Sequence, residues 1–136
     1  MSSKVILVMG LSGSGKTTLA TELSNRLKAY HLNADVIRKQ YDDWDFSKEG
    51  RMRQAARLKG LASESDSEYV VIDFICPLKE GRAIIDADYV MWMDTVTSSK
   101  YKDTDGVFEK PSESAVHTIK SLKVNVNNVI LEIQGL

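Results

Sequence analysis

Residues 10–18 read GLSGSGKTT and have the composition of a loop that holds phosphate. They fit G-x-x-x-x-G-K-[ST], the Walker A pattern. Glycines let the backbone curl so that its N–H groups point at phosphate oxygens, and the helix that follows directs its positive end to the same place. In this pattern Lys16 reaches the β- and γ-phosphates of ATP and the hydroxyl of Thr17 binds Mg²⁺. The loop therefore predicts ATP and Mg²⁺ as cofactors.

The surroundings of this loop favour a functional motif over a chance match in a glycine-rich turn. Residues 4–10 (KVILVMG) are a continuous apolar run, which is typical of a buried parallel strand. From residue 16 to about 29, apolar side chains recur at helical spacing, which predicts an amphipathic helix. The predicted nucleotide-binding residues are Gly10, Leu11, Ser12, Gly13, Ser14, Gly15, Lys16, Thr17 and Thr18.

A carboxylate, Asp73, ends a second apolar run, YVVID (69–73), which matches the Walker B pattern of a metal-ordering acid after a strand. Buried strands also end in Asp for structural reasons, so the run alone leaves both interpretations open. A translocating or switch ATPase normally needs a longer chain with switch loops. The short chain instead favours a compact kinase of small molecules, which encloses its acceptor and excludes water.

Strand and helix patterns alternate along the rest of the chain. Further strands are predicted at 33–37 (NADVI), 69–76, 88–94 and 115–122, and further helices at about 47–63 after a Ser47 N-cap, at 79–85, and after Asn127 or Asn128. Alternation of this kind predicts an α/β P-loop kinase fold with a parallel sheet and helices on both faces. Ligands gather at the carboxyl ends of such strands. The residues expected on that rim are Gly10, Arg38, Asp73 and Asp94.

The bulk composition predicts one soluble domain over residues 1–136. The chain has 18 basic and 19 acidic residues, and its net charge of -1 does not require nucleic acid or an anionic membrane as a partner. Its single cysteine, Cys76, cannot form an internal disulfide. The apolar run at 5–9 is too short for a signal peptide, and no stretch is long enough to span a membrane. These features predict a cytoplasmic protein.

Six segments appear in an order that resembles the adenylylsulfate kinases (APS kinases) and their smaller relatives. They are GLSGSGKTTLA (10–20), NADVIR (33–38), FSKEGR (46–51), DFICP (73–77), WMDT (92–95) and DTDGVFEKP (103–111). The first segment is especially close to the family's form. The other segments are weak matches one by one, and they support the resemblance through their order and spacing. The resemblance spans about residues 4–120. It implies transfer of the ATP γ-phosphate to the 3′-hydroxyl of adenosine 5′-phosphosulfate (APS).

The resemblance assigns roles to two residues of the second segment. The family's D-G-D-N-V-R reads N-A-D-V-I-R here, so Asp35 and Arg38 are kept and Asn33 replaces the first Asp. Asp35 would order Mg²⁺ or accept the proton of the acceptor, and Arg38 would bind the phosphosulfate. A turn or helix cap remains the alternative for Asp35, and a surface arginine for Arg38.

The family pattern F-S-x-x-D-R-x-E-N-I-R is only partly present. Phe46, Ser47 and Arg51 match it, whereas Gly50, Arg53, Gln54, Ala55 and Ala56 replace its Asp, Glu, Asn, Ile and Arg. Arg51 would still grip an anion, Gln54 would hydrogen-bond the acceptor, and Phe46 would stack on its adenine. Asp73 stands where full-length members carry a small polar residue. The implied catalytic residues are Lys16, Asp35 and Asp73, the metal ligands Thr17, Asp35 and Asp73, and the acceptor-binding residues Arg38, Phe46, Arg51, Gln54, Phe74 and Ile75.

The segment over the site is shorter than in full-length APS kinases. They carry a long basic lid after the counterpart of Asp94-Thr95, whereas here the expected lid loop covers only about residues 95–111. Lys100 and Lys102 would stabilise charge on the transferring phosphoryl group. No arginine remains there to act as a finger, and Tyr101 is the sole candidate for the second stacking aromatic.

Three functions remain open from the sequence. The favoured one is an APS kinase-like, ATP-dependent phosphotransferase with a small-molecule acceptor. The helix predicted at 47–63 is basic, with Arg51, Arg53, Arg57 and Lys59. This helix and the short lid motivate a second function, a kinase for a nucleoside, a sugar or a nucleic-acid 5′-hydroxyl. The departures from the family motivate a third one, a nucleotide-binding module without transfer. No membrane partner is expected, nucleic acid is disfavoured without being excluded, and a homodimer is left open.

Overall fold

The computed structural model describes residues 3–112 and 116–136, and within them five parallel strands form one sheet. The strands are β1 (Lys4–Met9), β2 (Tyr30–Asn33), β3 (Tyr69–Asp73), β4 (Tyr89–Met93) and β5 (His117–Ile119). The helices are α1 (Lys16–Leu27), α2 (Ala34–Tyr41), α3 (Lys48–Ser63), α4 (Lys79–Ile85), α5 (Lys102–Val107) and α6 (Val126–Gln134). The strand order is β2-β3-β1-β4-β5, and every pair is parallel.

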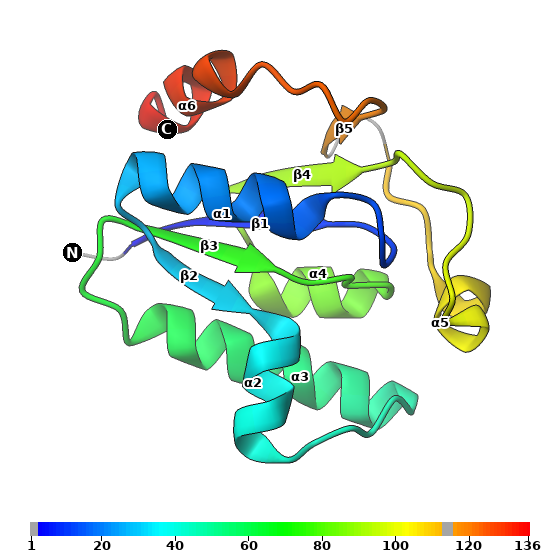
Figure 1. Ribbon diagram of the computed structural model, residues 1–136. Helices are drawn as coiled ribbons and strands as arrows, with labels where there is room; N and C mark the ends of the chain where they lie inside the picture. The colour runs from blue at the N-terminus through cyan, green and yellow to red at the C-terminus, as the bar shows by residue number, and fades with distance from the viewer. Residues whose placement is uncertain (1–2, 113–115) are drawn as a thin grey trace.

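The central strand β1 supplies side chains to two separate cores, because successive residues of a strand point to opposite faces. Val5, Leu7 and Met9 pack into the core under α2, α3 and α4. Ile6 and Val8 pack into the core under α1 and α6. Figure 1 shows α1 and α6 on one face of the sheet and α3 and α4 on the other. The predicted α/β fold with helices on both faces is confirmed.

The order of the strands determines where a ligand can bind. From β1 the chain passes through α1 to β2 on one side, whereas from β3 it passes through α4 to β4 on the other side. Adjacent strands whose connections diverge in this way leave a crevice at their carboxyl ends. In this sheet the crevice lies beyond β1 and β3. Residues 10–15 and Asp73 therefore meet at the edge toward which the arrowheads of Figure 1 point.

The strand predicted at 33–37 is wrong, because the chain turns into a helix at this point. Strand β2 covers Tyr30–Asn33, and the side chain of Asn33 accepts a hydrogen bond from the N–H of Val36, at 3.1 Å, as the N-cap of α2. Asp35 lies in the first turn, where a negative charge stabilises a helix. Val36 and Ile37, the apolar residues that suggested a strand, lie on different faces of α2, where Ile37 is buried and Val36 is exposed.

Several other boundaries differ from the predictions. The strand expected at 69–76 ends at Asp73, the one expected at 88–94 covers 89–93, and the loop expected at 95–111 contains α5. The last helix is capped by Asn125, whose side chain accepts from the N–H of Asn128, and not by Asn127 or Asn128. The strand expected at 115–122 is seen at 117–119, and residue 115 lies outside the described residues. The helix at 48–63 with its Ser47 cap and the helix at 79–85 are confirmed.

Across the described ranges 3–112 and 116–136, none of the helices has both the length and the apolar character needed to cross a bilayer.

Replacing Leu23 with Ala should lower the free energy of unfolding by about 2–5 kcal/mol. Leu23 is wholly buried between α1 and the sheet, so its removal leaves a cavity. Urea denaturation followed by circular dichroism measures the loss. The control is Leu131→Ala on α6, where the side chain is 67% exposed, and its effect should stay within about 0.5 kcal/mol. Equal losses in the two variants would contradict the packing of α1 described above.

Candidate active site

The phosphate loop between β1 and α1 depends on glycines for two physical reasons. Gly15 has φ 93°, a left-handed conformation that side chains rarely adopt. Gly10 has φ 152°, and a Cβ there would lie 2.7 Å from the carbonyl oxygen of Met93 at the end of β4. The loop can therefore lie against β4 only with glycine at position 10.

Hydrogen-bond donors of this loop and of α1 remain available for a ligand. Gly15 caps α1 without a side-chain hydrogen bond, so the first N–H groups of the helix have no side-chain partner at the cap. The hydroxyl of Ser14 is buried and has no hydrogen-bond partner within the described residues. Thr95, just after β4, donates its hydroxyl to the carbonyl of Ser14 at 2.6 Å and fixes the loop from outside. Such an arrangement suits a phosphate group.

A cavity that is partly open to solvent lies next to the loop at the carboxyl ends of β1 and β3. Of the residues predicted from the sequence, those that line it are Lys16, Thr17, Asp35, Arg38, Phe46, Arg51, Asp73, Phe74 and Ile75. Residues that are separated by up to about sixty positions in the chain thus share one cavity, although their individual roles remain predictions.

Asp73 is the most enclosed acid of the cavity, with 2% of its surface exposed. Its Oδ2 accepts a hydrogen bond of 2.8 Å from the side-chain amide of Asn33. The Nε2 atom of His31 lies 3.8 Å from the same oxygen, which is an electrostatic contact and too long for a hydrogen bond. Burial alone would raise the pKa of Asp73. The neighbouring imidazole, the hydroxyl of Thr17, the charge of Lys16 and the amide of Asn33 outweigh it, so the pKa lies below its usual value.

Lys16 and the acids around it form the half of the cavity nearest the phosphate loop. Burial lowers the pKa of Lys16, and the charges of Asp73 and Asp35 oppose that shift. The hydroxyl of Thr17 and these two carboxylates are oxygen donors, which Mg²⁺ prefers. The described residues hold no group of three or more His, Cys, Asp or Glu side chains suited to a metal. These oxygens therefore fit a magnesium ion that also binds nucleotide phosphates and water.

Two arginines on the opposite side of the cavity, Arg38 and Arg51, form their hydrogen bonds within the described residues with neutral oxygen atoms. Arg38, only 3% exposed, donates to the main-chain carbonyls of Asp43 and Asp45 at 3.1 and 3.3 Å. Arg51 donates to the carbonyl of Phe46 at 2.8 Å and to the hydroxyl of Thr104 at 3.1 Å. Burial lowers the pKa of both, but guanidinium groups stay protonated in proteins. Neither forms an ion pair with a carboxylate in the described part of the chain, so this side favours an anion.

The aromatic ring of Phe46 lies beside both guanidinium groups. The Cζ atom of Arg38 is 4.5 Å from the centre of the ring, and that of Arg51 is 5.5 Å away. At these distances the face of the ring attracts a cation. Phe46 is nevertheless 45% exposed, which leaves part of its surface for a flat ligand.

Among the residues predicted for the acceptor and the lid, three do not line the cavity. Gln54 is fully buried behind it, where its amide donates to the carbonyl of Ala34 and accepts from Arg57, both at 2.8 Å. Lys100 lies over the ring of Tyr101, 5.2 Å from its centre, and Lys102 begins α5. Neither lysine is part of the cavity wall.

Sequence reasoning missed other residues that do line the cavity, namely Asn33, Ala34, Pro77 and Thr104. All four lie inside segments that resemble the APS kinases, so their position was a usable signal. For Thr104, on α5, the segment did not predict the contact with Arg51, which the tertiary fold makes.

A second hollow lies on the other side of the phosphate loop, and no sequence motif predicted it. Its lining residues are Gly13, Gly15, Thr18, Leu19, Glu22, Met93, Leu122, Val124 and Val126. The lining is mostly apolar, and Leu122 and Val124 belong to the segment between β5 and α6. An apolar hollow that touches the phosphate loop is a suitable place for the base of a nucleotide.

Comparison with known proteins adds a family and several relatives. A family model described as AAA domain matches residues 5–85, which is more than half of the chain. A probable adenylyl-sulfate kinase of Aeropyrum pernix is 29% identical over 92 residues, which cover 60% of this chain and 49% of that protein. A protein of the same description from Pseudomonas aeruginosa is 28% identical over 119 residues, covering 78% and 56%. The chain thus spans about half the length of these curated relatives.

Solved structures share the fold. The APS kinase CysC of Mycobacterium tuberculosis, solved in complex with AMPPNP and APS, has a TM-score of 0.76 at 22% identity and matches over 99% of both chains. A gluconokinase from Sinorhizobium meliloti has a TM-score of 0.66 at 15% identity, over 97% of this chain and 90% of the other. At such identities these matches establish the P-loop kinase fold alone.

The surroundings of Asp73 predict how stability changes in acid. A carboxylate whose pKa is lowered by folding stabilises the native state above its unfolded pKa of about 3.9. This contribution is lost as the pH falls from about 5 through the folded pKa. Urea unfolding at a series of pH values should therefore give a shallower acid decline for Asp73→Asn than for the unchanged protein. Glu68→Gln, at an exposed position before β3, should keep the original slope. Parallel declines for all three proteins would contradict this account.

Proposed function

The chain belongs to the AAA domain family, and from this premise we propose that it is a P-loop kinase that transfers the γ-phosphate of ATP to a small-molecule hydroxyl. The observation that carries the proposal is the cavity that Lys16 and Asp73 share with Arg38 and Arg51. It joins a phosphate-donor half to a half that favours an anion. A module that only binds nucleotide has no need for the second half.

The acceptor that we propose is adenosine 5′-phosphosulfate. Two buried arginines, whose hydrogen bonds in the described part of the chain go to carbonyls and a hydroxyl, suit its phosphosulfate group. The exposed part of Phe46 suits the adenine ring, because aromatic side chains stack on flat bases. The names of the two curated relatives, and the APS bound in the similar CysC structure, support the same acceptor.

The proposed reaction uses the two halves together. The loop N–H groups and Lys16 hold the β- and γ-phosphates, and Asp35 accepts the proton of the acceptor hydroxyl. The acceptor oxygen then bonds to the γ-phosphorus while the bond from that phosphorus to the β–γ bridging oxygen breaks, and ADP leaves. Magnesium bound at Thr17, Asp35 and Asp73 would neutralise charge on the phosphates. The apolar hollow beside Gly13 would receive the base of ATP.

A second candidate keeps the reaction and changes the acceptor to a sugar or a nucleoside. It is favoured by the position of Lys100 and Lys102 outside the cavity, since a lid without charge at the site constrains the acceptor less. A nucleic-acid acceptor has less support. Arg53 and Arg57 of the basic helix α3 bind Asp43, so their charge is already partly balanced.

A panel of acceptors tests the proposal. The purified protein is incubated with labelled ATP, Mg²⁺ and, in turn, APS, gluconate, a nucleoside and a 5′-hydroxyl oligonucleotide, and products are identified by mass spectrometry. We expect a phosphorylated product from APS. Lys16→Ala should lower its rate by about a hundredfold or more, because it removes a charge aimed at the transition state. Lys39→Ala, at an exposed position of α2, serves as the control and should keep the rate.

Each other result of the panel has a defined meaning. Product from a different acceptor alone would replace APS and keep the kinase. Tight ATP binding without transfer to any acceptor would select the nucleotide-binding module instead.

A further inference from the structure

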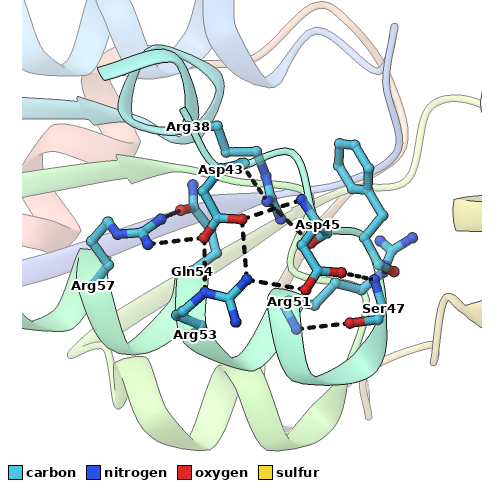
Figure 2. A network of polar contacts seen from close by, with 10 residues as sticks. Arg38, Asp43, Asp45, Ser47, Arg51, Arg53, Gln54 and Arg57 are labelled. Atoms are coloured by element: carbon cyan, nitrogen blue, oxygen red, sulfur yellow. Dashed lines mark hydrogen bonds and ion pairs between the residues drawn. The ribbon is translucent and has the colours of Figure 1, made fainter. Parts of the chain in front are cut away.

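The loop between α2 and α3 forms one wall of the acceptor half of the cavity. Residues 42–46, which we name the acidic loop, contain Asp42, Asp43 and Asp45 and end at Phe46. Figure 2 shows the side chains of Asp43 and Asp45 turned toward α3, where Arg53 and Arg57 bind them. The loop thus brings carboxylates close to a site that we propose binds an anion.

The carboxylates of the acidic loop are bound to α3. Asp43 Oδ2 accepts from Arg53 Nε and from Arg57 Nη2, each at 2.9 Å, and its Oδ1 accepts from Arg53 Nη2 at 3.1 Å. Asp45 Oδ2 accepts from Arg53 Nη2, also at 3.1 Å. The hydrogen bonds from Arg53 and Arg57 hold the pKa of Asp43 well below its usual range. Asp43 and Arg57 are only 12% and 14% exposed at their side chains, so their ion pair is shielded from water more than a surface pair is.

The main chain of the same two residues faces the other way. The carbonyls of Asp43 and Asp45 accept from Nη1 of Arg38, as Figure 2 also shows. Arg38 is therefore held by neutral oxygens of two residues whose charged oxygens are bound elsewhere. Among the charged groups around Arg38, Asp43 acts on it most strongly. If the carboxylate of Asp43 were released from α3, we would expect it to pair with the guanidinium of Arg38.

We propose that Arg53 and Arg57 are positioning residues for acceptor binding, because they withhold the carboxylates of Asp43 and Asp45 from Arg38. The charge of Arg38 is then left for the anionic group of the acceptor, which neither Arg53 nor Arg57 touches. This inference rests on the proposed acceptor site and names the residues that keep it positively charged.

The departures from the family pattern support the inference. Arg53 is one of them, and Gly50 is another. A side chain at position 50 would collide with the main-chain carbonyl and the side chain of Asp45, so the acidic loop can lie this close to α3 only over a glycine. Gly50 and Arg53, which differ from the family pattern, thus both help to hold the acidic loop against α3.

Binding of inorganic sulfate tests the inference without any need for turnover. The ¹⁵N-labelled protein is titrated with sulfate, and the Nε–Hε signals of Arg38 and Arg51 report occupancy. We expect the Arg53→Ala/Arg57→Ala double variant to bind sulfate about tenfold more weakly, because a freed carboxylate neutralises Arg38. Adding Asp43→Asn to the double variant should restore most of the affinity, since Asn keeps the carbonyl and removes the charge.

The rescue separates charge from mere support of the loop. If Arg53 and Arg57 only held the loop in place, Asp43→Asn would not restore binding, and the inference would be wrong. Equal sulfate affinity in the double variant and the unchanged protein, or no sulfate signal at Arg38 in the unchanged protein, would also overturn it. Arg53→Ala alone, which leaves the Arg57 pair, repeats the comparison should the double variant unfold.

Lys48→Ala is the matched control, since it removes one positive charge from the same helix. Lys48 pairs with Glu80 of α4 at 3.0 Å on the surface and forms no ion pair with the acidic loop among the described residues, so its loss should leave sulfate affinity unchanged. With an active acceptor, the double variant should raise KM for that acceptor and leave KM for ATP as it was. A protein that binds sulfate as described and phosphorylates nothing would contradict the proposed function and keep this inference.

Discussion

A carboxylate buried at the end of a strand has to be surrounded by donors, and much of this structure serves that requirement. Asp73 lies opposite Asn33 in the pairing of β2 with β3 and opposite Val8 in the pairing of β1 with β3. The first pairing brings the amide of Asn33 to its oxygen, and the second brings the start of α1, with Lys16 and Thr17, to the same place. A shift of either strand by one residue would leave the acid without its partners. The register of the sheet therefore determines whether Asp73 has the donors that the site needs.

The cavity divides its charges unequally. Around the phosphate loop, Lys16 and the acids of the site balance each other. Across the cavity, Arg38 and Arg51 are held by carbonyls and a hydroxyl, which orient a guanidinium without cancelling its charge. Asp43, the acid that acts most strongly on Arg38, is held by α3. The half around the phosphate loop thus has little net charge, whereas the half with Arg38 and Arg51 is positive. This difference favours a metal-bound nucleotide at one end of the cavity and a free anion at the other.

The sequence predicts those parts of the structure that are local. The alternation of apolar runs predicts the parallel sheet, and the glycine pattern predicts the loop, because both depend on neighbouring residues. Residues 33–37 are misjudged, since one capping side chain, that of Asn33, turns an apolar segment into a helix. Leu122 reaches the second hollow through the folding of a distant segment, and no local pattern marks it. Thr104 lies in a segment that resembles the APS kinases, but nothing in that segment predicts its contact with Arg51. Gln54 has the right type for a ligand contact, yet a main-chain carbonyl, that of Ala34, occupies its amide.

Gly50 has a consequence for which substitutions this chain tolerates. Because the acidic loop lies directly over it, a larger residue at this position is harmful for as long as Asp43 and Asp45 remain bound to α3. Release of the loop first would in turn give up the arrangement that keeps Arg38 unpaired. The size of residue 50 on α3 and the charge left on Arg38 of α2 are therefore coupled through the acidic loop that lies between them.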